Sequence, residues 1–355
     1  MYGVSIYLCA SNGGRIVLIH SLRYNTPSNF LWITKVDRSV RLKAVIYNAY
    51  GSADVLKLAD LPAPETAAGE VLIKVHAASL NPKDILVRKG KFARFTKSSF
   101  PLISGYDVAG EIVGVAKGVT HFRAGEHVFG MRNGWFGGAC AEFVSVSADE
   151  LVHKPASLGW KEAAALPLVS LTALQALRDG IKLCEGERIC INGASGGVGT
   201  VAIQIARLMG AHVTAICSDR NEKHVLELGA HEVINYKKTD ILTLGQTFHA
   251  FFDVFGNRTY KDVQRLIPSA SRYVTTVPSM RTLFQEGIAR LGFPSPRLVV
   301  VKSNVRDLLQ LREWVLEGKL KPVIDRTFSL EECQEAHRYI ETKRARGKVM
   351  IDLGV

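Results

Sequence analysis

The hydrophobic pattern in the middle of the chain switches repeatedly between the period of a strand and the period of a helix. Residues 189–191 are an apolar run of the kind that forms a buried strand. Apolar residues then recur with the spacing of one helix face, at Val198, Val201, Ala202, Ile205, Ala206 and Met209. A second apolar strand at 212–217, a short helix that ends at Leu228 and a third strand at 233–236 follow. This order predicts a βαβαβ unit with parallel strands.

The segments on either side of this unit carry other patterns. Short runs of strand-forming residues, separated by Gly, Pro and Asn turns, predict strands at 71–75, 108–115, 127–129 and 141–146. Beyond the βαβαβ unit, residues 251–255 predict another strand, and residues 308–320 and 330–340 predict helices. A last strand is expected at 348–351. The chain therefore contains a β-rich part and an α/β part.

The first 42 residues differ from the rest because they show no sustained hydrophobic period, so regular structure is expected to begin near Leu42. Three interpretations stay open: an acid-poor targeting peptide, a docked extension, or a start site assigned too far upstream. We expect the protein in the cytoplasm, or in the mitochondrion or plastid if residues 1–42 are a targeting peptide.

Composition narrows the class of protein. The chain has 355 residues, of which 47% are hydrophobic and 22% charged, which suits a globular protein with room for two domains. No apolar run approaches the roughly 18 residues of a membrane span. Of the net charge of +12, residues 1–42 carry +4, with five Lys/Arg against one Asp. The remaining +8 is spread along the chain without a Lys/Arg tract, so it indicates a basic surface that attracts an anionic cofactor rather than a nucleic acid. The six cysteines form no C-x-x-C pair, which argues against a structural zinc site and fits a reducing compartment.

Glycines lie at the boundary between the first predicted strand of the α/β part and the helix that follows it. Gly193, Gly196 and Gly199 are spaced three apart, which departs from the G-x-G-x-x-G pattern. A glycine turn lets the backbone approach a pyrophosphate, and the N–H groups that open the helix bind its negative charge. The turn from Gly193 to Gly199, with Ser195, Gly197 and Val198 between the glycines, is therefore predicted to bind a dinucleotide.

The end of the second strand indicates which dinucleotide binds. An enzyme specific for NADH carries Asp or Glu there to hold the ribose diol. This chain has Ser218, followed by Asp219, Arg220, Asn221 and a nearby Lys223, a set that suits a 2′-phosphate. NADPH is therefore the predicted cofactor. The alternative is that these residues are solvated charges at the start of a helix.

Several motifs together resemble the medium-chain dehydrogenase/reductase superfamily, over about residues 43–354. In detail they are similar to its zinc-independent quinone oxidoreductase branch, and to the subgroup of the chloroplast envelope homologue. The motifs are S-L-N-P-K-D at 79–84, G-Y-D-V-A-G at 105–110, A-A-A-L-P at 163–167, L-T-A-L-Q-A-L at 171–177 and R-G-K-V at 346–349.

This resemblance implies a fold of class α/β with two domains. One is a Rossmann-type doubly wound parallel sheet that binds NADPH, at 169–301. The other is a GroES-like β-rich catalytic domain, formed by 43–168 and 302–355, after an N-terminal extension at 1–42. We expect a homodimer.

The resemblance also bears on metal binding. Zinc-dependent relatives place a Cys near the position of Asn81 and a His-Glu pair where this chain has Tyr106 and Asp107. Without those ligands there is no Lewis acid, so the acceptor of a hydride must already be electrophilic, such as a quinone or an α,β-unsaturated carbonyl compound.

Two residues are candidates for catalysis. Asn81 is expected to donate a hydrogen bond to the oxyanion that forms, although it could simply be a turn residue before Pro82. Tyr106 could donate a proton or pack in the core. Asp84 is expected to cap a helix rather than to act as an acid. The sequence at 91–95 argues against the activity of the mitochondrial enoyl-thioester reductases.

Other cofactor contacts follow from the resemblance. They are Thr172 near the carboxamide, Gly196, Gly197 and Val198 at the pyrophosphate, Ser218, Arg220 and Tyr236 at the adenosine phosphate, and Gly256, Asn257, Ala345, Arg346 and Gly347 elsewhere. Alternatively, Arg344, Arg346 and Lys348 form a solvated basic end. Two other functions stay open: an alkenal/alkenone double-bond reductase, and an NADPH- or RNA-binding protein with little turnover.

Overall fold

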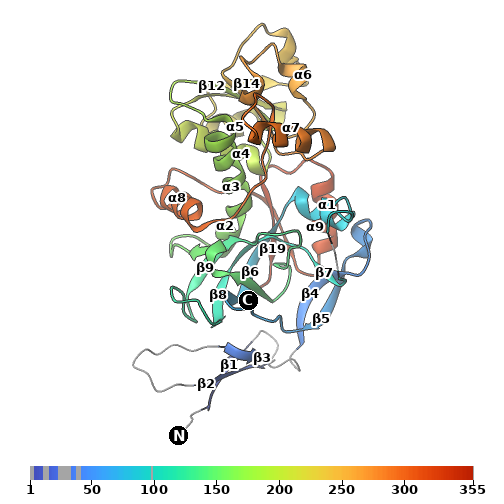
Figure 1. Ribbon diagram of the computed structural model, residues 1–355, viewed down its shortest axis with the longest axis vertical. Helices are drawn as coiled ribbons and strands as arrows, with labels where there is room; N and C mark the ends of the chain where they lie inside the picture. Colours follow the sequence, from blue (N-terminus) through green and yellow to red (C-terminus); the bar gives the residue numbers. More distant parts are fainter. Residues whose placement is uncertain (1–3, 11–15, 23–32, 37–40, 97–98, 355) are drawn as a thin grey trace. The chain divides into compact units, whose positions relative to one another are not determined.

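A computed structural model describes residues 4–10, 16–22, 33–36, 41–96 and 99–354 (Figure 1). The chain divides into two compact units. Unit 1 comprises Met1–Pro167, Ser303–Arg312 and Ile324–Val355, and unit 2 comprises Leu168–Lys302 and Glu313–Val323. The expected boundaries at 168/169 and 301/302 lie within one residue of these limits, but Glu313–Val323 groups with unit 2 and interrupts the expected return of 302–355 to the first domain.

The N-terminal segment contains regular structure, so the expectation that it begins only near Leu42 was wrong. Strands β1 (Val4–Ala10), β2 (Ile16–Leu22) and β3 (Ile33–Val36) form an antiparallel sheet in that order. The sequence contained a signal for the β1–β2 pair, because Asn12-Gly13 stands between two apolar runs. Asn-Gly between such runs is a strong hairpin signal, which acts without a long hydrophobic period.

The main sheet of unit 1 has seven strands, in the order β11-β9-β8-β6-β19-β18, with β10 also pairing with β6. Its strand β6 (Glu70–Leu80) pairs with neighbours on both edges, and its side chains are buried along most of its length because they pack in the apolar core of the unit. The other strands are β8 (Asp107–Val115), β9 (His127–Met131), β10 (Phe143–Ser147), β11 (Leu151–His153), β18 (Ile324–Ser329) and β19 (Lys348–Asp352). All strands predicted for the β-rich part are confirmed.

The rest of unit 1 completes its core. A three-stranded sheet has the order β5-β4-β7, with β4 (Arg41–Tyr47), β5 (Lys57–Pro62) and β7 (Leu102–Ile103). The helices are α1 (Pro82–Arg88), α2 (Trp160–Ala165) and α9 (Cys333–Glu341), while α8 (Val305–Leu316) spans the boundary at Arg312. Residues of α9 and β19 belong to the same apolar core as β6 and β8. The C-terminal segment is therefore built into this unit.

Unit 2 contains a six-stranded parallel sheet in the order β14-β13-β12-β15-β16-β17. Its strands are β12 (Arg188–Asn192), β13 (His212–Cys217), β14 (Glu232–Asn235), β15 (Ala250–Asp253), β16 (Tyr273–Thr275) and β17 (Arg297–Leu298). The order reverses between β12 and β15, as in a doubly wound sheet, and such sheets bind ligands at the carboxyl ends of the strands at this point. The predicted Rossmann-type fold is confirmed.

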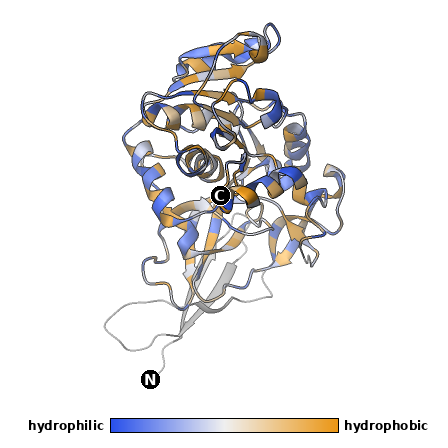
Figure 2. Cartoon of the chain, turned by 45° about the horizontal axis from the view of Figure 1, so that its top comes forward, coloured by the Kyte–Doolittle hydropathy of each residue, from blue (hydrophilic) through white to orange (hydrophobic). Residues whose placement is uncertain are grey.

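The helices of unit 2 are α3 (Pro167–Gln175), α4 (Gly197–Leu208), α5 (Glu222–Glu227), α6 (Tyr260–Val263) and α7 (Met280–Arg290). Helix α4 packs on β12 and β13 with the apolar face that the sequence predicted. In Figure 2 helices carry both hydrophobic and hydrophilic stretches. Within the described ranges, no helix combines the length and apolar character that a membrane span requires.

Candidate active site

The glycine turn of unit 2 lies between β12 and α4, and the backbone geometry requires a glycine at two of its three spaced positions, 193 and 199. Gly193 has a φ of +81°, and a Cβ there would lie 3.0 Å from the Cβ of Phe255. A Cβ on Gly199 would lie 2.3 Å from the carbonyl oxygen of Gly193, so the helix can approach the turn only without a side chain. Gly196 caps α4, and a Cβ there would meet nothing closer than 3.6 Å. The turn thus presents open backbone at a helix N-terminus, which suits a phosphate group.

Polar side chains join the ends of β12 and β15 at the point where the strand order reverses. The amide of Asn192 donates to the carboxylate of Asp253 and to Oδ1 of Asn257, at 2.7 Å each. The backbone N–H of Gly256 donates to the same Asp253 carboxylate at 3.0 Å. Burial raises the pKa of Asp253. These contacts bring Gly256 and Asn257, both expected at the cofactor, to the end of the strand that leads into the glycine turn.

Three further predicted residues meet beside the glycine turn. The side-chain N–H of Asn221 lies 2.8 Å from Oγ of Ser195 and 3.4 Å from Oγ of Ser218. Oδ1 of Asn221 is buried and has no hydrogen-bond partner among the residues that the structure describes. An unsatisfied buried acceptor is costly, so this oxygen is suited to receive a donor from a ligand.

The residues expected at the adenosine phosphate lie on the surface of unit 2. Arg220 is exposed, and Tyr236 is 59% exposed. Asp219, which could have bound a ribose diol, instead pairs with Lys237 at 3.0 Å. That hydrogen bond lowers the pKa of Asp219. The carboxylate is therefore already occupied by a cation, while Arg220 and Tyr236 are accessible to a ligand.

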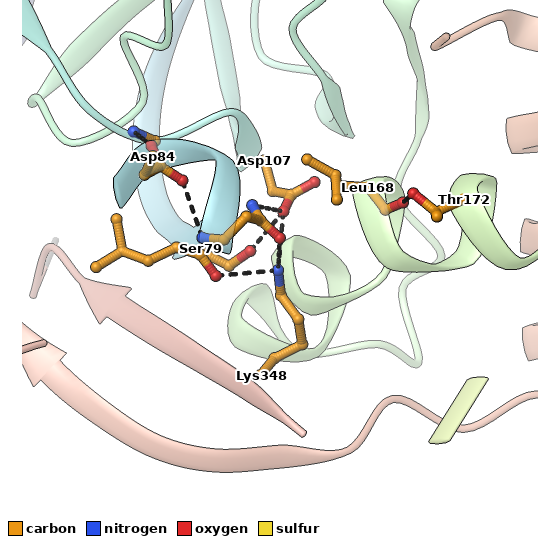
Figure 3. Close-up of polar contacts among 9 residues, drawn as sticks. Ser79, Asp84, Asp107, Leu168, Thr172 and Lys348 are labelled. Atoms are coloured by element: carbon orange, nitrogen blue, oxygen red, sulfur yellow. Dashed lines mark hydrogen bonds and ion pairs between the residues drawn. The ribbon is translucent and has the colours of Figure 1, made fainter. Parts of the chain in front are cut away.

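Thr172 lies on α3 and is 5% exposed. Its hydroxyl donates to the carbonyl oxygen of Leu168, one turn earlier, at 2.6 Å (Figure 3). The hydroxyl proton is thus used within the helix, and the oxygen can accept a hydrogen bond from a ligand.

Asn81 belongs to a buried polar cluster in unit 1, formed with Ser79, Asp107 and Lys348. Its amide N–H donates to Oδ2 of Asp107 at 2.9 Å, and its Oδ1 accepts a hydrogen bond from the ammonium of Lys348. The hydroxyl of Ser79 donates to the same carboxylate oxygen at 2.6 Å, and Lys348 lies 3.1 Å from it (Figure 3). Asn81 is 1% exposed and Asp107 is fully buried. The amide is therefore held from both ends.

Asp84 takes part in the cap of helix α1, but the helix begins at Pro82 with Asn81 as its N-cap residue, so Asp84 lies within the helix rather than directly before it as expected. Its carboxylate accepts the backbone N–H of Asn81 at 2.9 Å and that of Gly105 at 2.6 Å. Burial raises the pKa of Asp84 to about 6, although these two backbone hydrogen bonds oppose the rise. This cap fixes the backbone of Asn81 at the start of the helix and attaches it to the residue before Tyr106.

The contacts of Tyr106 support its packing interpretation. The side chain is 1% exposed, and its hydroxyl donates to the carbonyl oxygen of Trp135. The ammonium of Lys83 lies 3.8 Å from the centre of its ring. Burial raises the pKa of the phenol, which makes it a weaker proton donor. A catalytic role for Tyr106 stays a prediction.

The C-terminal motif lies in unit 1. The backbone N–H of Arg346 donates to Asp325 at 3.0 Å, and Gly347 has a φ of +116°. Ala345 packs against the apolar core of this unit. A cofactor contact of Ala345, Arg346 and Gly347 stays a prediction. The alternative of a solvated basic end is wrong for Lys348, which is 3% exposed.

Sequence reasoning did not find Lys348 or Ser79 as members of the cluster around Asn81. A local signal existed only for Lys348, whose charge directly precedes an apolar strand. Within the described ranges, no group of three or more His, Cys, Asp or Glu side chains is placed to hold a metal ion.

Comparison with known proteins identifies the family. Residues 67–156 match the family described as "Alcohol dehydrogenase GroES-like domain", and residues 228–351 match that described as "Zinc-binding dehydrogenase". The chain is 34% identical to the chloroplastic quinone-oxidoreductase QR1 of Triphysaria versicolor, over 88% of this chain and 98% of that protein. It is 34% identical to the mitochondrial NAD(P)H oxidoreductase RTN4IP1 of Bos taurus, over 90% of this chain and 91% of that protein.

A solved structure supports the same family assignment. The quinone oxidoreductase from Coxiella burnetii superposes with a TM-score of 0.81 at 33% identity, over 88% of this chain and 99% of that one. The chain therefore belongs to the medium-chain dehydrogenase/reductase superfamily, in its quinone oxidoreductase branch. It is an oxidoreductase with a nicotinamide cofactor.

Proposed function

We propose that this protein transfers hydride from NADPH to a quinone or an α,β-unsaturated carbonyl compound, without a catalytic metal. The observation that carries the proposal is the buried amide of Asn81, held by Asp107 and Lys348 in the unit that matches the GroES-like family. When bound, NADPH supplies the hydride. The relatives named as a quinone oxidoreductase and an NAD(P)H oxidoreductase support this class of reaction.

The cofactor is held by residues of unit 2. The first N–H groups of α4, at the open turn around Gly196, donate hydrogen bonds to the pyrophosphate. Oδ1 of Asn221, which has no partner among the described residues, accepts a hydrogen bond from a ligand hydroxyl. Arg220 binds the 2′-phosphate that distinguishes NADPH from NADH, because Asp219 is already paired with Lys237.

Calorimetric titration tests the choice of cofactor. NADPH should bind at least about tenfold more tightly than NADH, since a hydrogen bond to a charged group contributes about 1.5–3 kcal/mol. The variant Arg220→Ala should lose most of this preference and bind NADH as before. Equal dissociation constants of the original protein for the two cofactors would contradict this choice.

During the reaction the protein stabilises charge. One N–H of the Asn81 amide is donated to Asp107, and we assign the other to the acceptor oxygen on which negative charge develops. The amide does not titrate, so it can serve over a wide range of pH. Asp84 holds the backbone of Asn81 in place through its hydrogen bond.

The proposal that no metal takes part rests on the hydrogen bonds that Asp107 already accepts. The carboxylate of Asp107 accepts hydrogen bonds from Ser79, Asn81 and Lys348, so a cation is already beside it. Activity should survive treatment with a chelator, and elemental analysis should find no stoichiometric zinc. One zinc per chain, with activity lost on its removal, would refute this part of the proposal.

A second candidate is the reduction of alkenal or alkenone double bonds. The 2-methylene-furan-3-one reductase of Solanum lycopersicum is 35% identical, over 90% of this chain and 81% of that protein. NADPH oxidation should be followed with a panel of quinones, enals and enones, and the products identified. A hydroquinone product supports the first candidate, and a saturated carbonyl product supports the second.

We also propose a homodimer in the cytoplasm, with an organelle as the alternative location. Two relatives carry the words chloroplastic and mitochondrial in their names. Fluorescent fusions of the whole chain and of the chain from residue 42 separate the locations. If only the whole chain enters an organelle, residues 1–41 carry the targeting signal.

A further inference from the structure

We propose that Lys348 is a positioning residue, which orients the amide of Asn81 and supplies the buried positive charge beside it. The inference rests on the function proposed above and adds a residue that the sequence analysis did not assign to the cluster around Asn81. Strand pairing explains why residues so far apart in the sequence meet: β19 runs antiparallel to β6, with Val349 opposite Leu80. The next residues along each strand, Lys348 and Asn81, are therefore neighbours at the end of the ladder.

All three N–H donors of the Lys348 ammonium have acceptors. They are Oδ1 of Asn81, the carbonyl oxygen of Leu80 at 3.3 Å and Oδ2 of Asp107 at 3.1 Å. The side chain of Lys348 is 4% exposed and that of Asp107 is fully buried. A buried ammonium whose donors are all used has a fixed position, unlike a lysine at the surface.

These contacts determine which way the Asn81 amide points. An ammonium cannot face the NH2 group, and a carboxylate cannot face the carbonyl oxygen, so Lys348 and Asp107 exclude the flipped amide from opposite sides. Oδ1 is bound to Lys348 and one N–H to Asp107, and the second amide N–H has no partner among the residues that the structure describes. That N–H has a fixed direction and is the donor assigned above to the acceptor oxygen.

The charge of Lys348 also favours catalysis. A hydrogen bond to Oδ1 draws electron density from the amide nitrogen, which makes its remaining N–H a stronger donor. In addition, the ammonium balances the carboxylate of Asp107. Without it, the buried negative charge of Asp107 would be less well balanced and would oppose the arrival of a second negative charge on the acceptor.

The first test replaces Lys348 with methionine, which keeps much of the side-chain volume and removes the charge. In stopped-flow measurements with NADPH and a quinone, the hydride step of Lys348→Met should slow by at least about tenfold. The dissociation constant of NADPH should stay within about twofold, because the proposed phosphate contacts at the glycine turn and Arg220 lie in unit 2 and the substitution leaves Ala345, Arg346 and Gly347 in place. The matched control is Lys161→Met, which removes an exposed ion pair of the same 3.1 Å length with Asp352 of β19. An unchanged hydride step in folded Lys348→Met would overturn the proposal.

A double-mutant cycle with Asn81→Ala tests whether Lys348 acts through Asn81. If it does, Lys348→Met adds little further loss once the amide is absent. Multiplicative losses would overturn the proposal. Failure of the proposed function is distinguishable, because the original protein would then oxidise NADPH with no acceptor of the panel.

Removal of Lys348 alone leaves Asp107 buried without its cation, so the single variant could fail to fold. The double variant Lys348→Met/Asp107→Asn removes both charges and keeps an oxygen for the amide of Asn81. Its melting temperature should return towards that of the original protein while the hydride step stays slow. Recovery of both would show a purely structural role for Lys348 and would overturn the proposal.

Discussion

His337 lies in the core of unit 1, on α9, with no exposed surface. Neither of its ring nitrogens has a hydrogen-bond partner among the described residues. Burial, helped by the nearby charge of Arg88, lowers the pKa of His337 from 6.5 to about 3. The folded protein therefore keeps this imidazole neutral over the whole physiological range.

This burial predicts a specific pH dependence of stability. Between pH 6.5 and about pH 3 the unfolded chain binds a proton on His337 that the folded chain does not. The free energy of unfolding therefore falls as the pH is lowered through that range, by up to about 1.4 kcal/mol per pH unit. His337→Leu should remove this component and, because it removes two unsatisfied nitrogens, should stabilise the protein at pH 7 by about 1–3 kcal/mol.

Urea unfolding of both proteins between pH 4 and pH 8 checks this prediction. The pH dependence of Asp84 has the opposite sign: its stabilisation is present below pH 3.8 and is lost as the pH rises through about 6. Since both proteins contain Asp84, the difference between them isolates His337. A difference in unfolding free energy that does not change with pH would contradict the assignment.

The sequence analysis predicted those contacts of the site that join residues close together in the chain. The glycine turn and the capping role of Asp84 depend on contacts within a few residues, and both were predicted, although the partner of Asp84, the backbone N–H of Asn81, was not. Lys348 was missed because its contact with Asn81 depends on the pairing of β19 with β6, across more than 250 residues. No local pattern contains that register.

At the scale of elements, the glycine turn allows the sharpest test of cofactor binding. A methyl group at Gly199 would lie 2.3 Å from the carbonyl oxygen of Gly193 and 2.7 Å from backbone atoms of Ala194. Because these atoms belong to the backbone, the turn itself must move. Gly199→Ala should weaken NADPH binding by at least about tenfold, since the N–H groups of the turn would no longer converge on the pyrophosphate.

The control for this change is another helical glycine. A Cβ on Gly287 of α7 would meet nothing within 4 Å, so Gly287→Ala should leave binding unchanged and stabilise the helix by about 0.5–1 kcal/mol. Calorimetry of both variants measures the effect. If Gly199→Ala binds NADPH like Gly287→Ala, the turn does not hold the cofactor.

At this scale the sequence also predicted most of the fold. The alternation of strand and helix periods was enough for β12, α4, β13 and β14, because both faces of a parallel sheet are covered and its strands are strongly apolar. The strands of the N-terminal segment were missed because two strands of seven residues each carry little hydrophobic period.

At the scale of the whole molecule, helix α7 is the feature that points to an assembly. Its apolar stripe is exposed: Met280 is 74% and Phe284 is 71% exposed, while Glu286 is buried and binds Arg297 and the backbone of Leu298 in β17. Helices usually bury the apolar face instead. A second copy of the chain would cover this stripe, in line with the homodimer proposed above.

Light scattering checks this prediction. The variant Phe284→Glu should convert a dimer into a monomer, because it would place a charge in an apolar interface. The control Leu226→Glu changes an isolated apolar residue of α5, which is 47% exposed, and should leave the dimer intact. A monomeric original protein, or a dimer that Phe284→Glu does not affect, would show that the stripe has another role.

The hydride step of Asn81→Ala tests the central claim most directly, because the proposed reaction needs a donor for the developing oxyanion and Asn81 is the residue assigned to it. Single-turnover stopped-flow measurement with saturating NADPH and a quinone should show a rate at least about tenfold lower in the folded variant, with NADPH affinity preserved. An unchanged rate would contradict the account and would leave Asn81 as a turn residue before Pro82.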